Sequence, residues 1–266
     1  APGYYSALAH RGFFPVEELH TLRDINSRLQ GHPCSKETPG VEASTGPLGA
    51  GYPLALGVAL ADMHDDIDAY TYAILGDGEI NEGVVWETCM NASKFKADRL
   101  ISILDWNGVQ LDGTTEQIMP MGDIELKFKA FGYNTIVCDG HNVAALSAAI
   151  ETAKSVKGVP SIILAKTVKG KGISFMEGKN TWHGAPVKDA DYEAAMKELG
   201  FTDVFEVAIG ADLCAEQEAE DFIKEVPEKL PFMATSCCPA WSVMAKKLFP
   251  DYANCISMAL TPMTLT

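Results

Sequence analysis

The sequence contains no long apolar run and has little positive charge compared with its negative charge. Among 266 residues there are 36 Asp and Glu against 21 Lys and Arg, a formal net charge of -15. A chain this acidic repels polyanions unless it carries a concentrated basic face, so we expect no binding to nucleic acid or to an anionic membrane surface. No stretch reaches the apolar length of a membrane span, and no charged and apolar signal sequence opens the chain. We therefore expect a cytoplasmic protein without a membrane segment.

The sequence also lacks a C-x-x-C pair, an internal repeat and a low-complexity segment. Its 7 cysteines are scattered, and an odd number in a reducing compartment favours free thiols over disulfides. The apolar fraction of 47% is ample for a packed core. The chain opens at Ala1, without methionine and directly in helix-forming sequence, which suggests that an upstream segment is missing.

Short β-rich segments alternate with longer segments of helical pattern. The β-rich segments cover residues 69–75, 99–105, 133–139 and 160–166. The helical patterns include residues 15–29, 52–64 and 142–156. This alternation predicts an α/β fold with a parallel sheet, helices on both faces and ligands at the carboxyl ends of the strands. The pattern changes near residue 200, so we expect a domain over residues 1–200 and a short α/β fragment over residues 201–266.

An aspartate between two glycines follows the first predicted strand. Gly76 and Gly78 let the backbone turn tightly at Asp77 and approach a ligand, and Asn107 follows the next predicted strand. Because neighbouring parallel strands end at the same edge of a sheet, Asp77 and Asn107 can converge on one cation. A carboxylate, an amide oxygen, a backbone carbonyl such as that of Val109 and diphosphate oxygens are the ligands that Mg²⁺ prefers. The pattern predicts a magnesium ion that holds a diphosphate, although G-D-G by itself also fits an ordinary turn.

The segment GDGEINEGVVWETCMNASKFKADRLISILDWNGVQLDG resembles the thiamine diphosphate motif of transketolases. Three further segments resemble transketolase sequence in the same order, namely GHPCSKETPGVEASTGPLGAGYPLALGVALA, KTVKGKGISFME and WHGAPV. The likeness covers roughly residues 3–200. It implies a transferase of the pentose phosphate pathway that uses thiamine diphosphate and Mg²⁺ to move a two-carbon ketol unit between sugar phosphates.

The resemblance also implies roles for individual residues. It makes Asp77, Asn107 and the carbonyl of Val109 the ligands of Mg²⁺, and it places the backbone of Gly78 against the diphosphate. The other cofactor-binding residues that it implies are Gly46, Pro47, Leu48, Gly76, Glu79 and His183. His32 and His183 line the cofactor and substrate pocket as catalytic candidates, and Glu82 joins a carboxylate network at the subunit contact.

Other histidines and lysines have no such assignment. A lone histidine is usually an ordinary surface or core residue, and this is our expectation for His10, His20, His64 and His141. The lysines of KTVKGKG are suited to attract a sugar phosphate, but they also fit a solvated charged segment.

The sequence lacks two segments that members of the family contain. Family members take an activating glutamate from a second, pyrimidine-binding domain, and nothing after residue 200 resembles that domain. Some bacterial and archaeal transketolases are split into two polypeptides, and this chain resembles the N-terminal one. We therefore expect a C-terminal partner subunit in a homo- or hetero-oligomer. Without that partner we expect the chain to be inactive. A Ser-x-Gly-His segment with an active-site histidine usually precedes APGYYSALAHRGFF and is not present here, and the absence of this histidine puts activity in question even with a partner.

The last residues resemble a different family. VFEVAIGADLCAEQEAEDF and LPFMATSCCPAW resemble the start of the catalytic domain of iron-only hydrogenases, with Cys237 as a proton relay and Cys238 as a cluster ligand. A cubane iron-sulfur cluster needs four thiolates, and the spacing of Cys214 and Cys255 does not make them substitutes. We expect a truncated fragment without a cluster.

Three alternatives remain open beside a transketolase subunit. Within the same fold, a deoxyxylulose phosphate synthase or a 2-oxoacid dehydrogenase component is the nearest enzyme, although STGPLGAG and WHGAPV favour transketolase. A truncated, non-catalytic chain that binds the cofactor is the second. A hydrogenase-like iron-sulfur protein is the third.

Overall fold

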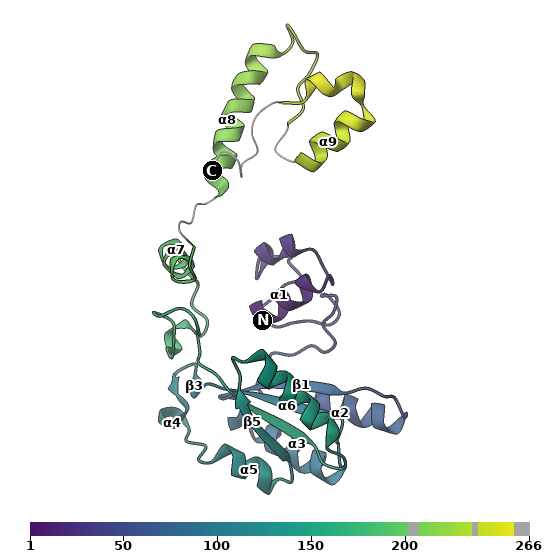
Figure 1. Ribbon diagram of the computed structural model, residues 1–266, viewed down its shortest axis with the longest axis vertical. Helices are drawn as coiled ribbons and strands as arrows, with labels where there is room; N and C mark the ends of the chain where they lie inside the picture. Colours follow the sequence, from purple (N-terminus) through teal and green to yellow (C-terminus); the bar gives the residue numbers. More distant parts are fainter. Residues whose placement is uncertain (202–206, 236–238, 258–266) are drawn as a thin grey trace. The chain divides into compact units, whose positions relative to one another are not determined.

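The computed structural model describes residues 1–201, 207–235 and 239–257 (Figure 1). The chain forms two compact units, Ala1–Pro186 and Val187–Thr266, and each is described here by itself. The boundary expected near residue 200 stays a prediction.

The first unit contains a sheet of four parallel strands in the order β1-β2-β6-β5. The strands are β1 (Thr71–Gly76), β2 (Leu100–Trp106), β5 (Asn134–Asp139) and β6 (Ser161–Lys166). Each begins one or two residues after the start of a β-rich segment of the sequence. The predicted parallel α/β sheet is confirmed.

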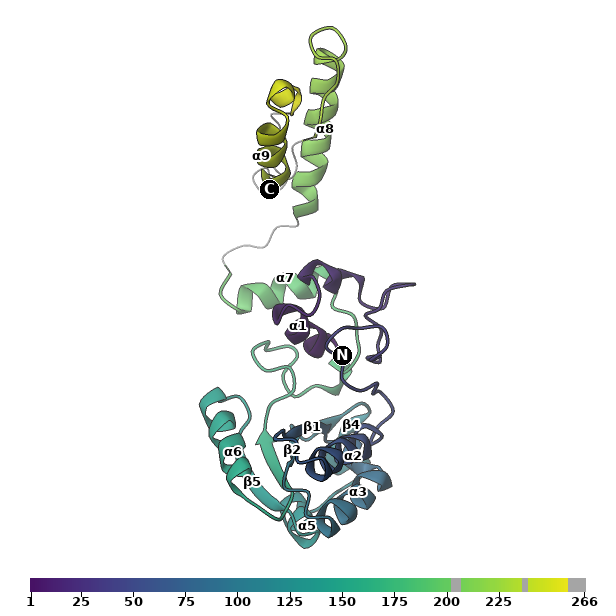
Figure 2. The same cartoon turned by 90° about the vertical axis from the view of Figure 1, so that its right-hand side faces the viewer.

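Helices cover both faces of this sheet, as Figure 2 shows for α6 on one side and α2 and α3 on the other. The first face packs α2 (Gly51–His64), α3 (Gly83–Lys94) and α5 (Ile124–Ala130) around buried side chains of β1, β2 and β6. The second face packs α6 (Val143–Ser155) against β2 and β6. Strands buried on both faces need nearly continuous apolar sequence, which explains SIILA in β6.

A buried group of hydroxyls fixes α2 to the sheet. The Tyr52 hydroxyl is 2.8 Å from the Ser102 Oγ atom and 2.7 Å from the Tyr133 hydroxyl. Burial raises the pKa of Tyr52 and Tyr133, so both stay protonated, and burial raises the pKa of the adjacent Cys89 thiol to about 11. Tyr52 is the second residue of α2, so this network holds the start of the helix, directly after the glycine-rich segment that ends at Gly51.

The amphipathic helix predicted over residues 15–29 is wrong. Only a short 3₁₀ helix, η1 (Val16–Thr21), forms, because the backbone takes positive φ angles of 68° at Arg23 and 69° at Asn26. Leu19, Leu22 and Leu29 still pack against α1 (Pro2–His10), but Ile25 is 92% exposed. The apolar spacing thus indicated the three leucines that pack inward but not the exposed Val16 and Ile25, and local turns determined the backbone.

Short elements complete the first unit near the carboxyl edge of the sheet. They are η2 (Glu79–Asn81), β3 (Val109–Gln110), β4 (Gly113–Thr114), α4 (Thr115–Ile118) and η3 (Asn180–Trp182). β3 and β4 form an antiparallel hairpin directly after β2.

The described part of the second unit is mainly helical. It contains α7 (Asp189–Glu198), α8 (Val207–Glu225), α9 (Pro239–Leu248) and η4 (Pro250–Cys255), with a β-bridge between Ala234 and Ile256. Cys237 and Cys238 lie outside the described residues, so the hydrogenase-like role stays a prediction. Across the described ranges of both units, no helix is both long and apolar enough to span a membrane.

Candidate functional site

Asp77 lies at the carboxyl edge of the sheet, in the turn after β1. The residue is 3% exposed, and its Oδ2 atom accepts hydrogen bonds from the backbone N–H groups of Asn107 at 2.9 Å and Gly108 at 2.5 Å. The turns after β1 and β2 are neighbours because these strands pair in parallel, with Gly76 opposite Asp105. The structure therefore brings the Asp77 side chain to the loop that carries Asn107.

One oxygen of the Asp77 carboxylate has no partner. Its Oδ1 atom is buried and makes no hydrogen bond, although buried carboxylate oxygens are normally paired. Burial raises the pKa of Asp77, and the two backbone N–H groups at Oδ2 partly oppose this rise. A cation at Oδ1 would compensate the buried charge, so the local chemistry fits a metal ligand.

Asn107 and Val109 follow β2 in the same loop. The Asn107 Oδ1 atom accepts a hydrogen bond from the Val109 N–H group at 3.0 Å, and an amide oxygen keeps a second lone pair for a further partner. Among the residues that the structure describes, no three His, Cys, Asp or Glu side chains form a metal-binding group. A metal at Asp77 would thus need amide, carbonyl and ligand oxygens, which suit a hard cation such as Mg²⁺.

Glu79 connects the glycine-rich segment before α2 to the turn after β1. Its carboxylate accepts hydrogen bonds from the N–H groups of Gly49 at 2.8 Å and Gly76 at 3.2 Å. Gly49 has a φ of 76°, and a Cβ atom there would lie 2.7 Å from Val84 Cγ1 and 3.1 Å from Glu82 Cβ. Backbone of residues 46–49 can therefore lie against the start of α3 only with glycine at position 49.

His32 lies against Gly46. A Cβ atom on Gly46 would lie 1.5 Å from His32 Nδ1, and φ at this glycine is 152°. The structure therefore brings together His32 and the glycine-rich segment, and their roles at the cofactor stay predictions. Pro47 and Leu48 are exposed beside them, Leu48 by 58%.

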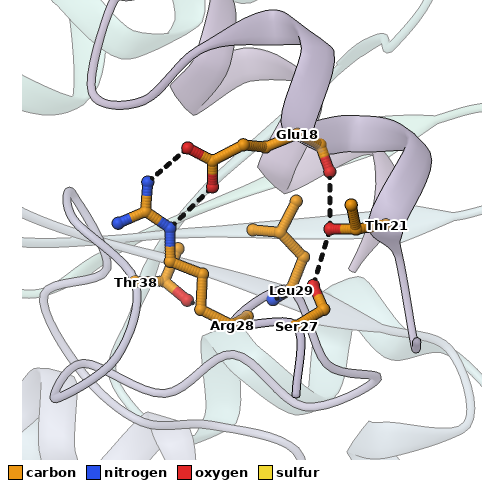
Figure 3. Close-up of polar contacts among 6 residues, drawn as sticks. All are labelled: Glu18, Thr21, Ser27, Arg28, Leu29 and Thr38. Atoms are coloured by element: carbon orange, nitrogen blue, oxygen red, sulfur yellow. Dashed lines mark hydrogen bonds and ion pairs between the residues drawn. The ribbon is translucent and has the colours of Figure 1, made fainter. Parts of the chain in front are cut away.

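A polar cluster braces the loop that carries His32 (Figure 3). Arg28 donates two hydrogen bonds to the Glu18 carboxylate, at 2.7 Å and 2.8 Å, and the buried Thr38 hydroxyl donates to the Arg28 carbonyl at 2.8 Å. This hydrogen bond between Thr38 and Arg28 joins the two ends of the loop 28–38, and His32 is one of the residues of that loop. Two parallel charge-assisted hydrogen bonds fix the orientation of Arg28 and hence the start of this loop.

The loop after β6 leads to His183. At its base the Thr167 N–H group donates to the Trp106 carbonyl at 3.2 Å, and further along the Asn180 side chain donates to the Leu111 carbonyl in the β3–β4 hairpin at 3.1 Å. Lys169 Nζ is 3.2 Å from His183 Nδ1. Burial and the Lys169 charge lower the pKa of His183, so its imidazole is neutral at neutral pH.

We expect Lys169→Met to raise the pKa of His183. The change removes the positive charge beside the imidazole, but burial is the larger cause of the lowered pKa and remains, so the rise is partial. An NMR titration of the histidine side chains measures it. Lys171→Met in the same loop is the control, because Lys171 pairs with Glu177 instead. Equal pKa values of His183 in the two variants would contradict the assignment.

Glu82 occupies the N-cap position of α3, but its side chain makes no capping hydrogen bond. The residue is exposed. The predicted carboxylate network joins Glu82 to residues of another subunit, which a single chain does not test. Its role at a subunit contact stays a prediction.

Three residues without a predicted functional role, among them His141, contribute to this region. His141 Nε2 accepts a hydrogen bond from the Val168 N–H group at 2.7 Å, and so holds the base of the loop that leads to His183. The Asn81 side chain donates to Gln110 Oε1 at 3.2 Å, beside Gly78. The one signal in the sequence for Asn81 and Gln110 is that each lies close to a predicted metal-binding segment.

Comparison with known sequences identifies one family. Residues 4–228 match the family described as "Transketolase, thiamine diphosphate binding domain". A 6-deoxy-6-sulfo-D-fructose transketolase subunit from Clostridium sp. is 42% identical over 198 residues, covering 74% of this chain and 72% of the relative. An apulose-4-phosphate transketolase subunit from Actinobacillus succinogenes is 39% identical over 201 residues, covering 75% and 72%. Transketolase 1 from Escherichia coli is 38% identical over 209 residues, covering 74% and 31%.

Solved structures agree with these matches. Transketolase from Campylobacter jejuni superimposes with a TM-score of 0.66 at 33% identity, over 70% of this chain and 30% of that one. Transketolase from Leishmania mexicana gives a TM-score of 0.69 at 29% identity, over 94% and 38%. The chain thus spans most of the subunit relatives but well under half of the transketolases in these structures.

Proposed function

Because the chain belongs to the transketolase family, within which it matches the thiamine diphosphate-binding domain, we propose that it is one subunit of a two-chain transketolase. The complete enzyme would move a two-carbon ketol unit from a ketose to an aldose. The buried Asp77 carboxylate, with one oxygen unpartnered beside the loop of Asn107, is the single observation that supports this proposal most directly. It offers a ligand for the cation that would hold a diphosphate.

The cofactors in this proposal are Mg²⁺ and thiamine diphosphate. Asp77, the Asn107 side chain and the Val109 carbonyl would hold the ion, and the unpartnered Asp77 Oδ1 atom fits this role. The backbone of Gly78 would lie against the diphosphate, and the exposed residues 46–48 against the rest of the cofactor. Bound thiamine diphosphate supplies the carbon nucleophile and the electron sink for cleaving the carbon–carbon bond of the ketose.

The sugar substrate in this proposal carries an anionic end. The two subunit relatives are named for a sulfonated ketose and for a phosphorylated sugar. In a chain with a net charge of -15, such a group needs local positive charge, which Lys169 offers beside His183. The neutral imidazole of His183 is suited to exchange a proton with a sugar hydroxyl.

The partner in this proposal is a C-terminal, pyrimidine-binding subunit. Both subunit relatives described above, each matched over 72% of its length, are named as subunits. The helix α2 is largely apolar on all sides, and Leu54 and Val58, one turn apart, are each 50% exposed. A helix of this composition is normally buried, which favours a covering protein surface.

The proposal is tested by measuring ketol transfer with this chain, with the companion subunit of a two-chain transketolase, and with both together. The donors are a ketose phosphate and a sulfonated ketose, the acceptor is an aldose phosphate, and thiamine diphosphate and Mg²⁺ are present throughout. We expect turnover only in the mixture. The same mixture with Asp77→Ala in this chain is the control for contaminating transketolase.

Two results would contradict the proposal. A complex that forms and binds the cofactor but transfers no ketol unit with either donor would favour the alternative of a non-catalytic chain. Turnover by this chain without its companion would show that no second subunit is required.

A further inference from the structure

We propose that Asn81 and Gln110 form a further pair of binding residues in the cofactor site, with the side-chain oxygen of Asn81 accepting a hydrogen bond from the hydrated cation held at Asp77. This inference rests on the proposed function, which supplies the cation and the diphosphate. It assigns a binding role to two side chains that lie beyond the predicted set.

The first observation is an unpartnered oxygen. Within the described ranges, three buried side-chain atoms lack a hydrogen-bond partner, namely Asp77 Oδ1, Asn81 Oδ1 and Thr135 Oγ1. Thr135 lies near the amino end of β5, away from the carboxyl ends at which ligands bind. The other two belong to one turn, the segment from Asp77 to the last residue of η2.

The second observation is how the Asn81 side chain is held. Its Nδ2 atom donates to Gln110 Oε1 at 3.2 Å, so the amide is held at its nitrogen while its buried oxygen has no partner. Gln110 Oε1 would lie 2.9 Å from a Cβ atom on Gly78, which places this pair of amides directly beside the second glycine of G-D-G. Since Gly78 is the expected diphosphate contact, the pair borders the ligand.

The third observation is which segments the pair connects. Asn81 follows Asp77 in the turn after β1, and Gln110 directly follows Val109 in β3. The hydrogen bond between their side chains therefore joins the two segments that carry the candidate metal ligands. It does so in addition to the contacts of the Asp77 carboxylate with the backbone after β2.

The chemistry of a free acceptor narrows what Asn81 can bind. An amide oxygen accepts hydrogen bonds or contacts cations, and it repels the oxygens of an ionised diphosphate. Mg²⁺ usually keeps several of its waters, and each water is a strong donor. Residues that hydrogen-bond to groups around a metal typically contribute about 10-fold to 100-fold in metal affinity.

The test is calorimetric titration of the 266-residue chain with Mg²⁺ in the presence of excess thiamine diphosphate, which measures the affinity for the cation. The variants are Asn81→Ala, Gln110→Ala and the double variant. Asn91→Ala is the matched control, because Asn91 is an exposed asparagine on α3 whose side chain donates only to the Glu87 carbonyl of the same helix. We expect each single variant to bind about 10-fold more weakly, the double variant to be little weaker than either, and the control to match wild type.

The thermal midpoint of the ligand-free chain separates binding from a merely structural role. Asn81→Ala removes a buried oxygen that has no partner, which favours stability, and the part-buried hydrogen bond to Gln110, which opposes it. Because these two changes act in opposite directions, the midpoint should stay close to that of wild type. Unchanged affinity in Asn81→Ala, or a lowered midpoint with unchanged affinity, would overturn the inference while leaving the proposed function intact. If the losses of affinity in the two single variants multiplied in the double variant, Asn81 and Gln110 would act independently, which would overturn the pairing. Wild-type chain that binds no thiamine diphosphate would refute the proposed function, and this inference with it.

Discussion

Asp77→Ala is expected to weaken binding of thiamine diphosphate in the presence of Mg²⁺ by more than about 100-fold, since it removes the one carboxylate among the expected ligands. Asp77 sits in a turn at the end of a rigid sheet, so the fold should persist. Calorimetry measures the affinity, and the circular dichroism spectrum reports the fold. Equal affinity in wild type and variant would remove Asp77 from the site.

Asp77→Asn sharpens this prediction, because it keeps the shape and removes the charge. Burial raises the pKa of Asp77, so the folded chain binds this proton more tightly than the unfolded chain does. The carboxyl group therefore favours folding at low pH, and this contribution is lost as pH rises through the raised pKa. Without metal, we expect the thermal midpoint of Asp77→Asn to exceed that of wild type by an amount that grows as the pH rises above about 4 and becomes constant above the raised pKa.

Added Mg²⁺ and thiamine diphosphate should reverse this order at pH 7. They stabilise only the chain that binds them, which here is wild type. A variant that is less stable than wild type at every pH without metal would show that the buried charge is already compensated within the protein.

Glu79→Ala is expected to have the second large effect. The change leaves the N–H groups of Gly49 and Gly76 without their acceptor, and Gly49 is buried. An unsatisfied buried donor costs about 1–3 kcal/mol, so the free energy of unfolding should fall by about that amount. Since the same carboxylate holds residues 46–49 beside the turn after β1, cofactor affinity should fall by about 10-fold or more.

Glu79→Gln and Glu87→Ala are the matched variants. Glutamine keeps one acceptor oxygen, so an intermediate loss of stability and affinity is expected. Glu87 is exposed on α3, and its loss should change neither quantity. Chemical denaturation and calorimetry measure the two quantities, and Glu79→Ala indistinguishable from Glu87→Ala in both would exclude the bridging role.

The local pattern of the sequence was sufficient for the sheet. Each strand is a short β-rich run between helical segments, and parallel strands of this kind must be covered on both faces. The same pattern located the edge at which Asp77 and the loop of Asn107 meet. Periodicity failed over residues 15–29, because the left-handed backbone at Arg23 and Asn26 ends the helix while the leucines remain in the core.

The partners of individual polar atoms depended on tertiary structure. Glu79 was expected to bind the cofactor, but its two hydrogen bonds to Gly49 and Gly76 depend on how the segment before α2 folds back over the turn after β1. The contact of His32 with Gly46, and that of Lys169 with His183, likewise join loops that are distant in sequence. Spacing along a chain carries no information about such contacts.

The sequence by itself determined the order of the elements, the parallel sheet and the two turns that carry Asp77 and Asn107, because periodicity and glycine placement act over a few residues. Only the tertiary structure decided which buried side-chain oxygens of the described residues remain without a partner, at Asp77, Asn81 and Thr135. The physical reason is that hydrogen-bond satisfaction depends on every group that folding brings within about 3 Å, whatever its place in the sequence.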